Sequence, residues 1–200
     1  SGGSQTVKGV AYYNLTLDSA VTKSYGSGIT VNNYLSVSGA AVISNSSSIS
    51  ISGNFIYSSS AISTLSNNLT AYGVILSNGT LNDGGNTITI NNGNGWVRTG
   101  GTFTTTGTVA FTGSTPSFIA GSLPTTFNNL TINNSEGVTL NLSPAAATIV
   151  ASALTLTNGV ITSTSSNILK LAAGSTASSG SVLSYVSGPM VKVGNTDFTF

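Results

Sequence analysis

The chain has 200 residues, of which only nine are Asp, Glu, Lys or Arg, and none is His or Cys. Without His or Cys, the usual ligands of zinc, haem and iron–sulfur centres are missing, and no nucleophile can be paired with a histidine base. Five basic residues and a net charge of +1 cannot neutralise the phosphates of a nucleic acid. We therefore expect no cofactor and no nucleic-acid partner, and most enzyme classes are excluded.

The remaining composition is typical of a folded β protein. Ser, Thr, Asn and Gly supply 108 residues, but Leu, Ile, Val and Phe supply 53, which is enough to bury a core. The longest nearly apolar stretch, residues 145–153, is about half as long as a membrane-spanning helix. We expect no membrane insertion. Scarce charge with abundant Ser and Thr favours an extracellular or cell-surface protein.

Short segments in which apolar and polar residues alternate recur along the whole chain. The clearest cover residues 15–17, 29–31, 35–37, 49–51, 88–90, 109–111, 130–132, 154–156 and 169–171. This alternation predicts strands that face a core on one side and solvent on the other. Asn and Gly separate the segments, and both tolerate the left-handed backbone of tight corners. No stretch has a convincing helical pattern.

Two internal repeats predict how these strands are arranged. Gly39, Gly79 and Gly159 each lie between apolar strands, and their separations of 40 and 80 residues suggest units of two coils with about 20 residues each. A longer repeat matches residues 7–17 with residues 119–132. Nested repeats indicate a solenoid, because each coil must bury its apolar face against a neighbour. We therefore predict an all-β right-handed parallel β-helix, a β-solenoid of roughly nine or ten coils, over residues 1–180.

The ends of the sequence lack the pattern of a solenoid cap. Residues 181–200 break the coil rhythm at Gly188 and Pro189, so we expect them to be a transition segment into a following β unit. Uncapped coils would present open strand edges. We therefore expect the native chain to continue beyond one or both ends.

Four segments resemble a known group of proteins. They are Tyr13–Leu17, Phe127–Ile132, Leu154–Thr162 and Ser184–Met190. In composition and order they are similar to the repeat modules of giant secreted, adhesin-like cell-surface proteins of Bacteroidetes, substrates of type IX secretion. The resemblance implies a surface location, a modular parent chain and a structural or adhesive role. Surface glycans, or neighbouring copies or modules of the same giant chain, would be the partners.

Carboxylate pairs need a separate test, because some parallel β-helices cleave polysaccharides. The chain has four acids: Asp18, Asp83, Glu136 and Asp197. A glycosidase needs two carboxyl groups roughly 5–9.5 Å apart. Asp18 and Glu136 occupy comparable turns of the longer repeat, about six coils and therefore near 28 Å apart. We expect solvated turn acids, no catalytic residues and no enzyme, with a polysaccharide-active β-helix as an alternative.

One segment has the appearance of a calcium loop. It is Asn82-Asp83-Gly84-Gly85-Asn86. Calcium prefers several oxygen ligands with more than one carboxylate, and this loop has one. We therefore predict a turn and no metal site.

Aromatic and hydroxyl residues offer two alternatives to a purely structural role. Trp96 and Arg98 could form a surface on which neutral glycans stack, with Tyr72 and with the further tyrosines Tyr12, Tyr13, Tyr25, Tyr34 and Tyr57, although aromatic residues of a β-helix are more often core or corner residues. Pairs of outward Thr residues make ice binding a less favoured alternative, because regular rows of Thr on a flat solenoid face order water. Irregular coil lengths should put these rows out of register. These pairs are Thr87/Thr89, Thr102/Thr104 and Thr155/Thr157.

Overall fold

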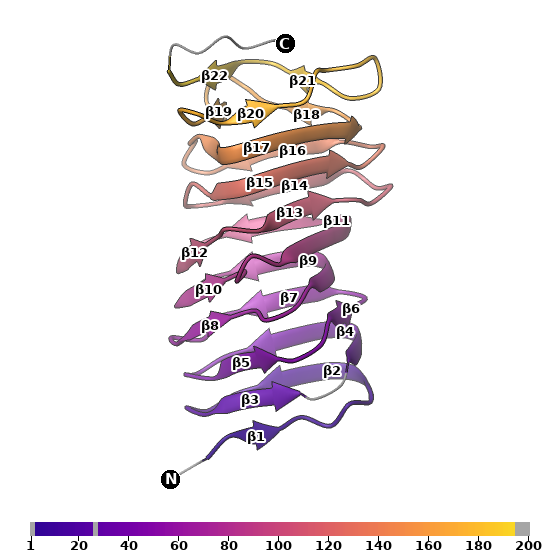
Figure 1. Ribbon diagram of the computed structural model, residues 1–200, viewed down its shortest axis with the longest axis vertical. Helices are drawn as coiled ribbons and strands as arrows, with labels where there is room; N and C mark the ends of the chain where they lie inside the picture. The colour runs from indigo at the N-terminus through magenta and orange to yellow at the C-terminus, as the bar shows by residue number, and fades with distance from the viewer. Residues whose placement is uncertain (1–2, 26–27, 195–200) are drawn as a thin grey trace.

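The computed structural model describes residues 3–25 and 28–194, and within them the chain forms 22 strands and no helix. The strands wind into a β-solenoid of about nine turns (Figure 1). As the chain rises from the N-terminus, it crosses the front from left to right and returns behind, which is a right-handed path. The predicted fold class is confirmed.

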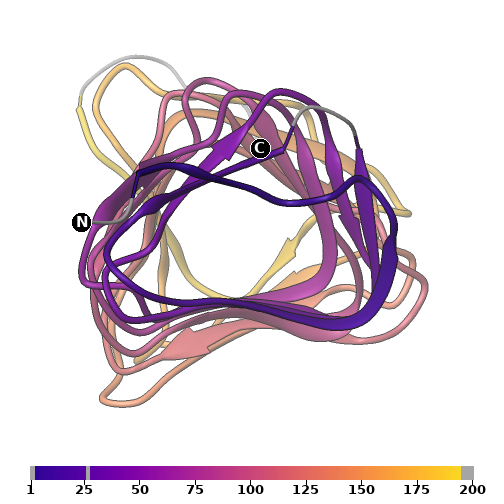
Figure 2. The ribbon, with the colours of Figure 1, turned by 90° about the horizontal axis from the view of Figure 1, so that it is seen from below.

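Viewed along its axis, the solenoid has three sides (Figure 2). Side 1 contains the first parts of four long strands, β2 (Ala11–Leu17), β4 (Ile29–Val37), β9 (Leu69–Leu76) and β11 (Thr87–Arg98). It also contains the last parts of two others, β15 (Thr126–Asn133) and β17 (Thr148–Asn158). Three short strands lie wholly on this side: β6 (Ile49–Ile51), β13 (Thr108–Phe111) and β20 (Thr176–Ala177). Side 2 contains the last parts of β2, β4, β9 and β11, with β7 (Asn54–Tyr57), β14 (Ser117–Gly121), β16 (Val138–Leu142), β18 (Ile161–Thr162) and β21 (Val186–Ser187).

Side 3 completes each turn. It contains β1 (Gln5–Thr6), β3 (Thr22–Tyr25), β5 (Val42–Asn45), β8 (Ile62–Thr64), β10 (Thr80–Asn82), β12 (Thr102–Thr104), the first parts of β15 and β17, β19 (Leu169–Leu171) and β22 (Met190–Lys192). The paired strands of all three sides run parallel, and consecutive sides meet at corners 1–2, 2–3 and 3–1.

The coil length is close to 20 residues at first and then increases. Thr30 pairs with Ser50, and Ser50 pairs with Thr70, each 20 positions later. Thr131 pairs with Thr155, which is 24 positions later. The extra residues lie in corners, as at the register shift between Ile90 and Gly95 in β11. Because the corners absorb the insertions, the ladders of hydrogen bonds on the sides stay in register.

The alternation of apolar and polar residues explains the core. On side 2 the inward position is occupied in successive turns by Leu35, Phe55, Val74, Trp96 and Ile119, all of them buried. The residues between them, such as Ser36, face outward and are partly exposed. Burying each large apolar side chain stabilises the fold by about 1.5–3 kcal/mol. The stacked turns together therefore bury the apolar surface that a single coil would leave exposed.

The 40-residue repeat is confirmed only in part. Gly39 and Gly79 occupy the same corner 2–3, two turns apart, with φ values of 60° and 59°. Gly159 instead follows the side 1 part of β17 and lies in corner 1–2. The longer repeat is wrong as a structural equivalence. Leu15–Leu17 lie on side 2, whereas Leu130–Ile132 lie on side 1, because the same short strand motif suits either side.

The expected boundary at residue 180 also needs correction. In β21, Val186 pairs with Ile161, and in β22, Met190 pairs with Leu169, both in parallel register. The described part of this segment therefore continues sides 2 and 3 instead of beginning another unit. What breaks the rhythm is a tight turn at Ser181–Ser184, which exposes Val182 and Leu183.

Candidate binding surface

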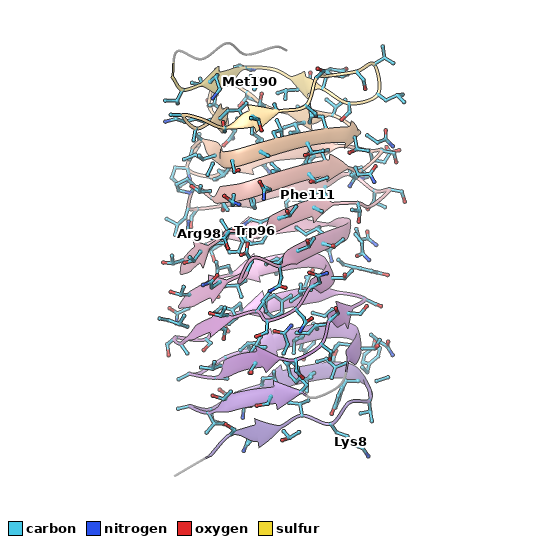
Figure 3. The ribbon with its side chains drawn as sticks, in the orientation of Figure 1. Lys8, Trp96, Arg98, Phe111 and Met190 are labelled. Atoms are coloured by element: carbon cyan, nitrogen blue, oxygen red, sulfur yellow. The ribbon has the colours of Figure 1, made fainter. Side chains whose placement is uncertain are left out.

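Trp96 lies inside the solenoid about midway along its length (Figure 3). Its side chain is fully buried, with ring centroids 4.6 Å from Phe103 and 5.3 Å from Phe127. The indole Nε1 donates a hydrogen bond to Thr125 Oγ1 at 3.2 Å. The ring has no exposed face on which a sugar could stack. Trp96 is therefore a core residue and is withdrawn as a glycan contact.

This burial predicts the fluorescence of the protein. Trp96 is the only tryptophan, so emission reports on this one site. We expect blue-shifted emission that iodide and acrylamide hardly quench in the native state, and a red shift with full quenching in denaturant. Steady-state fluorescence with Stern–Volmer titration tests this. Strong quenching of the native protein would contradict the placement of the indole.

Arg98 also lies at an inward position, in register with Leu76 on one neighbouring turn and Gly121 on the other. Its guanidinium donates hydrogen bonds to the backbone carbonyls of Gly101 and Pro124, and so ties strand β11 to two loops of corner 2–3. Partial burial lowers the pKa of Arg98 from its ordinary value. The carbonyl partners assign Arg98 a structural role, and these bonds occupy donors that a ligand would need.

Tyr72 is the expected site residue that remains near the surface. It is half-buried on β9 at corner 1–2, where its backbone N–H donates to Gly53 O at 2.8 Å. Tyr13 and Tyr34 lie at the same corner in earlier turns, and Tyr13 is 70% exposed. The structure therefore separates Tyr72 from Trp96 and Arg98 and groups it with other tyrosines.

Amide side chains lie at the same corner as these tyrosines. Asn33 Nδ2 donates to Asn14 Oδ1 at 2.8 Å, and Asn94 Nδ2 donates to Asn54 Oδ1 at 3.0 Å. The strand and repeat patterns did not predict these pairs, although their spacings of 19 and 40 residues match one and two coils. We call the set the tyrosine–amide corner. It comprises Tyr13, Asn14, Asn33, Tyr34, Asn54, Tyr72 and Asn94.

Asp83 differs from the expectation of a solvated turn acid. It is fully buried at corner 3–1, and its oxygens accept hydrogen bonds from the backbone N–H groups of Gly85, Thr106 and Gly107. The Thr105 hydroxyl donates to the same carboxylate. Because N–H and O–H donors already surround the oxygens, the arrangement is that of a structural link between two turns, not of a calcium loop.

The other acids do not come together. Asp18 is exposed in corner 2–3, where its Oδ1 accepts a hydrogen bond from the Ser19 N–H. Glu136 is exposed in corner 1–2, six turns further along. The expectation of comparable turns is therefore wrong. Asp197 lies outside the described residues, and those residues contain no group of three potential metal ligands.

Two polar side chains of side 3, those of Lys23 and Tyr25, also point into the solenoid. Lys23 is buried, and its ammonium donates to Gln5 Oε1. Tyr25, two residues later, is buried without a hydrogen-bond partner for its hydroxyl among the described residues, and this burial raises its pKa above the ordinary value. The Lys23 charge is therefore held inside, which leaves the outer surface still poorer in charge.

The outward Thr residues are only partly in register: some pair with Thr of the next turn, whereas Thr89 pairs with Ala110 and Thr104 with Asn82. Thr87 pairs with Thr108, and Thr80 pairs with Thr102, because the inserted residues lie in corners. The row of Thr residues on side 1 is also interrupted by a larger amide side chain, because Thr108 pairs with Asn129 in the next turn. The side therefore presents mixed hydroxyl and amide groups instead of one uniform array.

No family model matches the chain, and comparisons with the curated proteins and with the solved structures return no match either. Among the described residues, no helix is long and apolar enough to cross a membrane.

Proposed function

We propose that the chain is a non-catalytic β-solenoid module of a large secreted or cell-surface bacterial protein, and that it acts as a stiff stalk or an adhesion surface. The observation that supports this best is the continuity of the parallel ladders of sides 1 and 2 through about nine turns, whereas the ladder of side 3 is interrupted between β5 and β8 and between β12 and β15. Each turn is hydrogen-bonded to the next on the sides and packed on it through the core. A bend would have to break several of these contacts at once.

The surface chemistry fits the same role. Arg98, Asp83, Lys23 and Lys192 all make internal hydrogen bonds between turns, so four of the nine charged side chains help to hold the rod together. A nearly uncharged outer surface with many hydroxyl groups is soluble without attracting strongly charged partners. The surface location and the type IX route follow from the family resemblance, and neighbouring modules or surface glycans remain the proposed partners.

The dimensions of the rod give a direct test. Nine turns at about 4.8 Å per turn predict a length of roughly 40 Å. Small-angle X-ray scattering should give the maximum dimension and scattering profile of such a rod, and limited proteolysis should leave the turns intact. A compact spherical profile, or rapid cleavage within the strands under native conditions, would contradict the stalk. Labelling of intact cells with an antibody tests the location, and detection only after lysis would exclude a surface role.

A further inference from the structure

We infer that the tyrosine–amide corner binds a linear, neutral β-linked glucan. This inference rests on the proposed function, because it supplies the adhesion surface with a ligand class and a site. The corner combines aromatic rings, which can stack on the C–H faces of sugars, with amides that can bond to hydroxyl groups. No member of the set carries a charge.

The first amide pair has the donors and acceptors that a sugar edge requires. In the bond between Asn33 Nδ2 and Asn14 Oδ1, one amide donates and the other accepts. Asn14 Nδ2 and Asn33 Oδ1 have no hydrogen-bond partner within the described part of the chain, so the pair offers one free NH2 group to donate and one free carbonyl oxygen to accept. Adjacent equatorial hydroxyls of a sugar, each of which donates and accepts, complement such a pair.

The second pair repeats this chemistry across a glycine. Asn94 lies over Gly73 and passes it to bond to Asn54, which belongs to the turn below Gly73. A Cβ atom on Gly73 would lie 2.7 Å from Asn94 Cβ and 2.8 Å from the backbone C and O of Asn94, so any larger residue would displace Asn94 as a whole, its backbone included. Residue 73 must therefore lack a side chain if the Asn54–Asn94 pair is to form as observed.

Aromatic rings lie next to both pairs. Tyr13 and Tyr34 adjoin the Asn14–Asn33 pair along the chain, and Tyr72 directly precedes Gly73 beneath Asn94. The high exposure of Tyr13 and the partial exposure of Tyr72 leave ring surface available. Tyrosine provides a flat, rigid contact with few rotatable bonds, which limits the entropy cost of binding.

The arrangement favours an extended neutral chain over a single sugar. The centres of the two pairs lie about two and a half turns apart, which corresponds to roughly 12 Å along the axis. Glu136 is the nearest charged residue in the same corner, and it lies two turns beyond Asn94. Without a cation in the set, uronate or sulfate groups would lose their hydration without compensation. A linear chain with flat rings and equatorial hydroxyls can reach both pairs.

Isothermal titration of the full chain with cellohexaose and laminarihexaose tests the inference. We expect saturable binding of at least one of these glucans, weakened about tenfold or more in both Tyr72→Ala and Asn94→Ala. The matched control is Tyr185→Ala, which removes a more exposed tyrosine outside the set and should leave affinity unchanged. Far-ultraviolet circular dichroism and Trp96 emission verify that each variant is folded.

Several outcomes would overturn this assignment. They are the absence of saturable binding by the folded protein, equal binding by both corner variants and the native chain, and tighter binding of a sulfated glucan. Self-association that Tyr72→Ala abolishes, without any glucan binding, would identify the corner as a protein contact instead. None of these results affects the scattering or cell-labelling tests of the stalk, so failure of the ligand inference is distinguishable from failure of the proposed function.

Discussion

Replacing Trp96 with alanine is expected to lower the free energy of unfolding by about 3–5 kcal/mol. The substitution removes the largest side chain of the core and leaves a cavity between Phe103 and Phe127. It also leaves the Thr125 hydroxyl, which is buried, without the indole partner. The neighbouring turns cannot collapse into the space easily, because their strands are held in register by the side 2 ladder.

Urea denaturation followed by far-ultraviolet circular dichroism measures this loss, since the variant no longer has a tryptophan. Trp96→Phe is the conservative variant, and it should recover more than half of the loss by refilling much of the cavity. Tyr13→Ala is the matched surface control, because the Tyr13 ring is mostly exposed, and its effect should be within about 0.5 kcal/mol. A cost below 1 kcal/mol for Trp96→Ala would contradict the buried cluster.

The fold could be predicted from the sequence because its main determinants are local. Alternation in segments such as Ile49–Ile51 fixes which residues point inward, and the separation of Gly39 and Gly79 gives the coil length. The strand motifs do not specify which side of the solenoid they occupy. For that reason the longer repeat appeared to align Leu15–Leu17 with Leu130–Ile132, although the two segments lie on different sides.

The candidate site was harder to predict, because alternation fails where consecutive residues are apolar. In Trp96-Val97 either side chain could face the core, and only the register with Val74 and Ile119 places Trp96 inside. The amide pairs depend on contacts between turns. Asn54 and Asn94, for example, are 40 positions apart, so their contact is not visible as a local sequence pattern. Their coil-multiple spacing becomes informative once the solenoid is known.

Asp83→Ala is expected to destabilise the protein by about 3 kcal/mol, despite the position of Asp83 in a turn that looks exposed in the sequence. The native carboxylate accepts hydrogen bonds from three backbone N–H groups and a threonine hydroxyl. Alanine leaves these donors at a buried site without an acceptor. Because Gly85 belongs to one turn and Thr106 and Gly107 to the next, the loss should loosen corner 3–1 between β10 and β12.

Urea denaturation gives the change in stability, and amide hydrogen exchange locates it. We expect faster exchange at Thr106 and Gly107, with little change on side 2. Asp83→Asn keeps the shape of the side chain but replaces one acceptor oxygen with a donor that faces N–H groups, so it should recover only part of the loss. Asp18→Ala removes an exposed acid and should have an effect within about 0.5 kcal/mol. If Asp83→Ala were equally mild, the carboxylate would be an incidental turn residue, and the turns would be held together by the backbone ladders and the apolar core alone.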